Sequence, residues 1–202
     1  MTTAPRQAKK KDAILSAAVE IFSEKGFHNT KIEEIADLAK IGKGTIYEYF
    51  SSKEALFESS IRGCVEYLDG IIKREVLSKD TAKERLESFI RENINILLRF
   101  KNLAKLMSLD LMNPEKLKAF TNKELFKERL ALVIEIIRRG KEQGEFQQVN
   151  PYLAAAMIHS YLIGVTHVMI CFPEFMELED LEVTDEVVRL VMEGLSSIRV
   201  AE

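Results

Sequence analysis

A short run of polar residues in the first third of the chain has the chemistry that nucleic acids require. It combines two ammonium groups, three hydroxyls and one residue without a side chain, at Lys43, Gly44, Thr45, Tyr47, Tyr49 and Lys53. Such groups contact phosphates and base edges without needing a deep pocket. Lys53 also lies near a predicted helix start, where backbone N–H groups favour phosphate. The run therefore predicts a DNA-binding surface, to which we add Thr30.

Two short predicted helices position these groups. Thr30 and Glu33 have the spacing of a capping box, which predicts the start of the first helix. Residues 40–42 predict a tight turn, and residues 44–50 predict the second helix. Two short helices joined by such a turn form a helix-turn-helix, whose second helix enters the DNA major groove. An ordinary helical hairpin with aromatic packing has the same pattern and is the alternative.

The residues of this segment also resemble a known family. Residues 44–57, Gly-Thr-Ile-Tyr-Glu-Tyr-Phe-Ser-Ser-Lys-Glu-Ala-Leu-Phe, resemble the signature of the TetR family of bacterial transcription regulators. Residues 17–27 resemble the first helix of that family, and the specific resemblance covers residues 12–60. The resemblance implies an all-helical homodimer, in which an N-terminal domain binds operator DNA and a variable C-terminal domain binds a small ligand.

Two positions depart from the family pattern. Lys40 stands where the family usually has Gly, just after the first helix of the motif. Because helices often end in a left-handed residue, Lys40 must either tolerate about 1 kcal/mol of strain or close the turn differently. Gly42 stands where the family usually has Ser or Thr. Gly is a tolerable helix cap, but it offers no hydroxyl to a phosphate.

The charge distribution supports local contact with DNA. The chain has 202 residues and a net charge of −3. Residues 1–53 hold 9 Lys and Arg against 7 Asp and Glu, a balance of +2, which leaves −5 for residues 54–202. We therefore predict a DNA-binding domain at 1–53 and a helical ligand-binding and dimerisation domain at 54–202. The basic residues 1–11 are either a solvated tail or an arm that touches DNA.

The rest of the chain predicts long amphipathic helices. Ser51 and Glu54 form a second capping box, and the helix that they open is expected to end near Ser78. Its apolar stripe is Phe57, Ile61, Cys64, Val65, Leu68 and Ile72. Further helix starts are predicted at Thr81, Asn113-Pro114, Asn150-Pro151 and Thr184. A shorter helix is predicted over residues 102–112. The helix before Asn150 is expected to end at Gly140 and Gly144.

Residues 152–172 contain no Asp, Glu, Lys or Arg. Their length fits a membrane span. However, the segment contains His159 and His167, lies among charged amphipathic helices and has no close Lys or Arg flank, so we expect a helix buried on two sides. One side would face the ligand core and the other a partner subunit. The last helix would complete a four-helix dimer interface through Val187, Val188, Val191, Leu195 and Ile198.

Catalytic and metal-binding patterns do not emerge from the sequence. His159 and His167 are eight residues apart rather than four, and Cys64 and Cys171 form neither a Cys-x-x-Cys motif nor a zinc pattern. We therefore expect no enzyme, metal or cofactor. With no secretory leader in the sequence, we expect a cytoplasmic protein.

The C-terminal half is expected to hold a mostly apolar ligand pocket with a few orienting polar groups. The candidate lining residues are Phe89, Asn93, Leu97, Met107, Leu111, Phe126, Leu130, His159, Tyr161 and Thr166. For each of them, plain core packing is the alternative. The favoured hypothesis is a homodimeric repressor that binds a pseudo-palindromic operator and is released by a hydrophobic small molecule. The alternative is a constitutive helical DNA-binding or interaction module without an effector.

Overall fold

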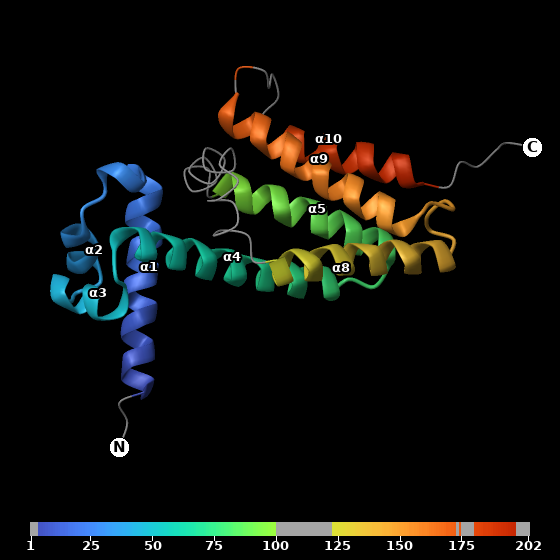
Figure 1. Ribbon diagram of the computed structural model, residues 1–202. Coiled ribbons are helices and arrows are strands. Elements are labelled where there is room, and N and C mark those ends of the chain that lie inside the picture. Colours follow the sequence, from blue (N-terminus) through green and yellow to red (C-terminus); the bar gives the residue numbers. More distant parts are fainter. Residues whose placement is uncertain (1–3, 100–122, 173, 175–179, 197–202) are drawn as a thin grey trace, which may run out of the picture. The chain divides into compact units, whose positions relative to one another are not determined.

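The computed structural model describes residues 4–99, 123–172, 174 and 180–196, and these residues are almost entirely helical (Figure 1). The helices are α1 (Ala4–Asn29), α2 (Ile32–Leu38), α3 (Lys43–Tyr49), α4 (Lys53–Leu77), α5 (Ala82–Arg99), α8 (Lys123–Glu142), α9 (Pro151–Cys171) and α10 (Asp180–Leu195). The predicted all-α class is confirmed. The predicted helix over 102–112, the predicted start at Asn113-Pro114 and the residues Met107, Leu111 and Ile198 lie outside the described residues.

The described residues form two compact units that divide within α4, between Tyr67 and Leu68. The first unit holds α1–α3 and the first part of α4. The second holds the rest of α4 with α5, α8, α9 and α10. The division falls later in the chain than the predicted boundary after residue 53, because the start of α4 packs with the first three helices. That packing centres on Phe22 of α1, whose ring lies 4.9 Å from that of Phe57 and 6.0 Å from that of Phe27.

Helix α1 is longer at its start than the sequence predicted. Its backbone is helical from Ala4, so from that residue on the basic segment is not a disordered tail. Ile14, Ala18 and Phe22 form its buried face, as the apolar spacing requires. Gly26 has φ 77° and interrupts the helix.

The turn of the helix-turn-helix is closed by a complete Schellman motif. The amide of Ile41 donates to the carbonyl of Ala36, and the amide of Lys40 donates to that of Asp37. Lys40 holds the left-handed position with φ 56°. Of the two ways to close the turn, the chain therefore uses the strained one. Gly42 caps α3 with extended backbone angles, as predicted.

Two of the predicted capping boxes are shifted by one residue. Helix α2 is capped at Lys31, whose amide donates to Glu34 Oε2 at 3.0 Å, so the predicted cap at Thr30 with Glu33 is wrong. At α4 the hydroxyl of Ser52, not that of Ser51, accepts the amide of Ala55 at 3.1 Å. Neither observed cap has the full capping-box sequence, because Lys31 has no hydroxyl and Ser52 is followed three residues later by Ala55 rather than by a glutamate.

The caps of two later helices are confirmed, and one is wrong. Thr81 and Glu84 form a reciprocal capping box at α5, with distances of 3.1 and 3.2 Å. The side chain of Asn150 accepts two amides at the start of α9, where Pro151 holds the first helical position. Thr184 does not cap α10, because that helix already begins at Asp180 and Thr184 is buried inside it.

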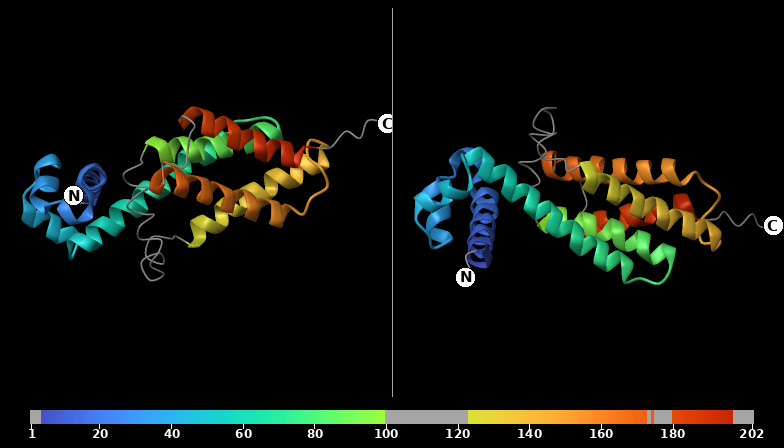
Figure 2. Two further views of the ribbon diagram at one scale, coloured as in Figure 1. Left: turned by 90° about the horizontal axis from the view of Figure 1, so that it is seen from above. Right: turned by 60° about the horizontal axis from the view of Figure 1, so that its bottom comes forward.

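The second unit is a helical bundle in which α5 packs against α8, α9 and α10 (Figure 2). Its core contains Leu86, Phe89, Ile90 and Ile94 of α5. Gly140 does not end α8 as predicted. It lies inside the helix, where a Cβ would come within 2.1 Å of the buried ring of Phe146. The end of α8 is a second Schellman motif, with Gly144 in the left-handed position at φ 72°.

Helix α9 is long and apolar enough, by length and composition, to cross a membrane. The core helix of a soluble bundle meets the same criterion. Here α9 packs against α5 and α8, and Ala155, Ile158 and Leu162 face the core of the unit. Its other side is exposed and apolar.

Candidate nucleic-acid interface and ligand region

The helix-turn-helix separates the residues of α3 into an inner and an outer face. Ile46 is buried within α3, and Phe50, which follows as its C-cap, is buried against the same core. Lys43, Gly44 and Tyr47 are exposed, whereas the predicted contacts Thr45 and Tyr49 are half-buried. Ile46 and Phe50 anchor the motif inward, and three of the seven predicted DNA contacts, Lys43, Gly44 and Tyr47, are exposed.

The side chain of Lys53 is fixed before any DNA is present. Its Nζ donates to the backbone carbonyl of His28 at 3.4 Å and lies 4.7 Å from the centre of the Phe27 ring. Both contacts are to the end of α1. A cation–π contact leaves the outer side of an ammonium able to bind another acceptor. Lys53 is thus a positioned cation at the start of α4.

Thr30 is a correction to the predicted DNA-binding set. Its side chain is only 3% exposed. Its hydroxyl lies 2.7 Å from the carbonyl of Gly26 and donates to it, so it closes the broken end of α1 rather than facing solvent. We leave Thr30 out of the proposed interface.

The Lys43 side chain forms an ion pair with a residue that the sequence analysis did not select. Its Nζ lies 2.6 Å from Oε1 of Glu33, in the first turn of α2. The contact lowers the pKa of Glu33 and raises that of Lys43, because each charge stabilises the other. The sequence signal for this pair is that two opposite charges, Glu33 and Lys43, stand on either side of the predicted turn.

In the second unit, a buried polar cluster joins three helices. Arg129 Nε of α8 lies 2.9 Å from Asp69 Oδ1 of α4, although its N–H is not directed at that oxygen, so the contact is an ion pair. A terminal nitrogen of Arg129 donates to Asn93 Oδ1 of α5. The amide of Asn93 in turn donates to the carbonyl of Phe89 at 2.6 Å. Asn93, one of the predicted ligand residues, therefore anchors a half-buried arginine.

Burial dominates the electrostatics of this cluster. It raises the pKa of Asp69 and lowers that of Arg129, and the attraction between the two charges opposes both shifts. Burial and the Arg129 charge lower the pKa of His159. The ring of His159 packs edge-on against that of Phe126, with centroids 4.8 Å apart. Three of the predicted ligand residues, Asn93, Phe126 and His159, are thus grouped around an arginine.

Asp69 and Arg129 were not among the residues predicted from the sequence. Each stands on or beside the apolar stripe of its helix, and their charges are opposite. That combination was the available signal for a buried pair.

The other described ligand candidates have separate surroundings. Phe89 belongs to the core, Leu97 and Leu130 are half-buried, and the buried hydroxyl of Thr166 donates to the carbonyl of Leu162 at 2.6 Å. A small void of about 10 Å³ lies beside Asp69 and Arg129. Among the described residues, no group of His, Cys, Asp and Glu side chains is arranged to hold a metal ion.

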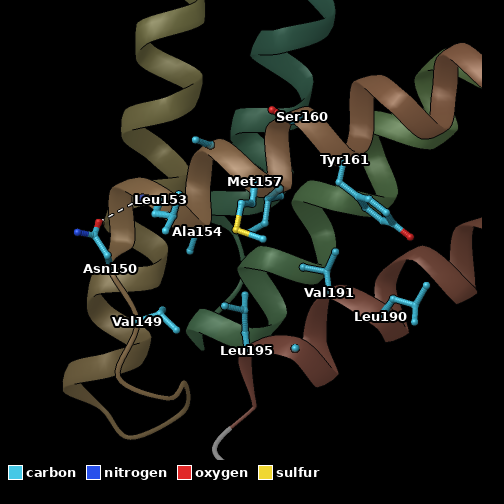
Figure 3. A pocket seen from close by; sticks show the side chains of 13 residues that line it. Val149, Asn150, Leu153, Ala154, Met157, Ser160, Tyr161, Leu190, Val191 and Leu195 are labelled. Carbon is cyan, nitrogen blue, oxygen red and sulfur yellow. Dashed lines mark hydrogen bonds between the residues drawn. The ribbon is translucent and has the colours of Figure 1, made fainter.

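An apolar groove of about 980 Å³ lies between α9 and α10 (Figure 3). Leu153, Met157 and Tyr161 follow one another along one side of α9, at the spacing of successive helical turns. Leu190 and Val191 of α10 line the groove with them. Leu153 is 62% exposed and Met157 is 63% exposed. Of the predicted ligand residues that the structure describes, only Tyr161 is among its lining.

The predicted dimer residues of α10 are divided between the core of the chain and the groove. Val187, Val188 and Leu195 are buried in the core of the chain itself. Val191 is half-buried at the groove. Because α10 packs its valine-rich side inward against α5, the exposed apolar surface is carried mainly by α9. Of the predicted dimer residues, Val191 and Leu195 also line the groove, whereas Val187 and Val188 do not.

Comparisons with known proteins agree with this architecture along the chain. Residues 14–59 match the family described as "Bacterial regulatory proteins, tetR family", and residues 64–194 match "YsiA-like protein, C-terminal region". The chain belongs to the TetR family. As a member of this family it is a DNA-binding transcriptional regulator with a helix-turn-helix and a C-terminal helical domain.

The relatives of this TetR-family chain include regulators of lipid metabolism. The "Fatty acid metabolism regulator protein" of Bacillus subtilis (strain 168) is 33% identical over 72% of this chain and 75% of its own length. The solved structure of FadR from Bacillus subtilis in complex with stearoyl-CoA has a TM-score of 0.72 and 26% identity, over 91% of this chain and 98% of that one. FadR from Bacillus halodurans has a TM-score of 0.73 and 28% identity, over 92% and 96%.

Proposed function

We propose that this regulator is a homodimeric repressor released from its operator by a long-chain fatty acyl thioester. The observation that supports this most is the likeness to FadR of Bacillus subtilis, which was solved with stearoyl-CoA and matches over nearly the whole of both chains. The apolar interior of the second unit supports a hydrophobic effector. The chain's expected cytoplasmic location and lack of enzymatic activity are consistent with this proposal.

The proposed DNA contacts are Lys43, Gly44, Thr45, Tyr47, Tyr49 and Lys53. The exposed side of α3 would enter the major groove, while Lys53 would bind a phosphate. Tyr47→Ala and Lys53→Ala are therefore expected to weaken binding to all sequences, and Lys53→Ala should also reduce the salt slope by about one unit. A variant with Lys43, Thr45, Tyr47 and Lys53 all changed to Ala that bound DNA as tightly as the parent would place the interface elsewhere.

The groove between α9 and α10 is proposed as the contact with a second copy of the chain. A large exposed apolar patch often marks an interaction site. A two-fold axis would pack the same face of a second copy against this patch and bury both. Such a dimer predicts a pseudo-palindromic operator with half-sites about 34–36 Å apart, or a multiple of that spacing. Met157→Glu should give monomers in sedimentation. Parent protein that sediments as a monomer at micromolar concentration would contradict the proposal.

The effector is proposed to act through the buried polar cluster. Asp69 belongs to α4, the helix that continues into the DNA-binding unit, whereas Arg129 and Asn93 belong to the bundle. A ligand whose polar group took Arg129 or Asn93 as a partner would favour a different position of α4 in the bundle. By population shift, that position would set the affinity of the dimer for DNA. Phe126 and His159 are the proposed apolar and polar neighbours of the ligand.

The decisive experiment measures operator binding with and without the thioester. An operator is first selected from random DNA with the full-length protein, and its affinity is then followed by fluorescence anisotropy. Stearoyl-CoA is expected to weaken binding at least tenfold, which corresponds to about 1.4 kcal/mol. Coenzyme A alone and stearate are the matched controls. Linkage requires operator DNA to weaken stearoyl-CoA binding by the same factor, which calorimetry measures.

The alternative is a constitutive DNA-binding module. It predicts selection of a defined operator but the same affinity with stearoyl-CoA, coenzyme A or stearate present. That result would leave the DNA-binding part of the proposal standing and overturn the effector part.

A further inference from the structure

The ion pair at the start of the recognition helix differs from an isolated lysine in what it offers to DNA. Lys43 is the first residue of α3, and Glu33 lies across the turn in α2. Their charged atoms are 2.6 Å apart, and the side chains are 51% and 57% exposed. Donor and acceptor therefore stand side by side on an accessible surface.

Such a pair is poorly suited to bind a phosphate. A free ammonium gains affinity from the phosphate charge and from the counterions that it releases. Next to a carboxylate that gain is offset, because the phosphate is repelled by Glu33 about as strongly as it is attracted by Lys43. The acidic residue would therefore be a disadvantage if Lys43 only held the DNA backbone.

The pair matches the major-groove edge of one kind of base pair. Guanine presents the acceptors N7 and O6, and cytosine presents the donor N4 beside them. A lysine pairs well with the guanine acceptors, and a glutamate accepts from the cytosine amine. We propose that Lys43 and Glu33 together recognise one G·C base pair in each operator half-site, so that Glu33 is a specificity-determining residue. This rests on the proposed entry of α3 into the major groove.

A neighbouring ion pair serves as the internal comparison. Glu34, the next residue of α2, lies 2.5 Å from Nζ of Lys25 on α1. Its carboxylate also accepts the amide of Lys31, so it belongs to the cap of α2. The two glutamates thus share a helical turn and a charge, but only Glu33 is joined to the recognition helix.

The test uses the full-length dimer and its selected operator. Each base pair of the half-site is changed symmetrically, and anisotropy gives the affinity of every variant operator. For the parent protein, one G·C to A·T change in each half-site should lower the affinity for the operator at least tenfold. This loss of affinity should require both Lys43 and Glu33. Glu33→Gln should remove most of that discrimination, raise affinity for random DNA several-fold and steepen the salt dependence by about one unit.

Glu34→Gln is the matched control, since it removes the same charge from the same turn. It should change affinity by a similar factor for all sequences and leave the base preference intact. Equal effects of the two substitutions at every base pair would overturn the proposal and make Lys43–Glu33 an ordinary surface pair. Loss of binding in Tyr47→Ala, seen alongside such equal effects, would show that the DNA-binding face itself is correctly assigned.

Discussion

Replacing Arg129 by Met should destabilise the second unit strongly, and in a pH-dependent way. The Asp69 side chain is only 10% exposed, and the Arg129 side chain is 24% exposed. Breaking a fully buried pair by removing one partner costs about 3–5 kcal/mol. Because water reaches part of Arg129, we expect the lower end of this range for the ion pair and the lost Asn93 contact together, or about 3 kcal/mol.

The pH dependence identifies the cause of that loss. Burial already raises the pKa of Asp69 above its ordinary value, and loss of the arginine charge would raise it further. A carboxyl whose pKa is higher in the folded state binds protons more readily there than in the unfolded state. Its contribution therefore becomes more favourable as pH falls through the folded-state pKa. The deficit of Arg129→Met should be largest at pH 7.5 and clearly smaller at pH 5.

Urea denaturation of parent and variant at equal protein concentration measures these free energies. Arg138→Met is the matched control, because Arg138 lies on the same helix but pairs with Glu135 at the surface. We expect it to change stability by about 0.5 kcal/mol or less. The double variant Asp69→Asn with Arg129→Met should recover part of the loss. A deficit below about 1 kcal/mol, or one equal at both pH values, would refute the buried ion pair as a source of stability.

Three further substitutions follow from single observations. Gly140→Ala should lower the free energy of unfolding by about 1–3 kcal/mol, because the added Cβ would collide with the buried ring of Phe146. Gly70→Ala is the control, and it should be neutral or stabilising because nothing lies near the added atom. Lys40→Gly should raise the free energy of unfolding by about 0.5–1 kcal/mol, because glycine adopts the left-handed backbone conformation of this position without strain. A lower free energy of unfolding in this variant would contradict that conformation. Because burial lowers the pKa of His159, the parent should lose stability as pH falls below about 6.5, where the unfolded chain takes up the proton first. His159→Gln should remove that part of the pH dependence in denaturation curves at pH 7.5 and 5.5.

Local signals in the sequence were enough to predict the helices. Asn150-Pro151 and Thr81 mark helix starts that the structure contains, because a cap is formed by residues three positions apart or less. The shifted caps show the limit of such signals. Thr30 and Lys31 each have a glutamate three residues later, and the hydroxyl of Thr30 is drawn away by the carbonyl of Gly26.

Contacts between distant residues explain what the sequence analysis missed. Asp69 and Arg129 are 60 positions apart, and no local pattern links them. The side of α10 that turns inward depends on such contacts as well. Its valines and Leu195 are apolar on more than one side, so only the packing against α5 determines which side turns inward. Amphipathic spacing predicts a buried face only where the opposite face is polar.

The cross-helix ion pairs Lys43–Glu33 and Asp69–Arg129 have the same chemistry and opposite consequences. Lys43–Glu33 lies at the surface, where water and salt make the pair nearly free to exchange. Both groups can therefore leave each other for a base pair at little cost. Asp69–Arg129 lies in the bundle, where neither charge can be left alone without a large penalty. A ligand that replaced one partner there would have to supply a group of matching polarity, which makes the buried pair a discriminating place for an effector to act.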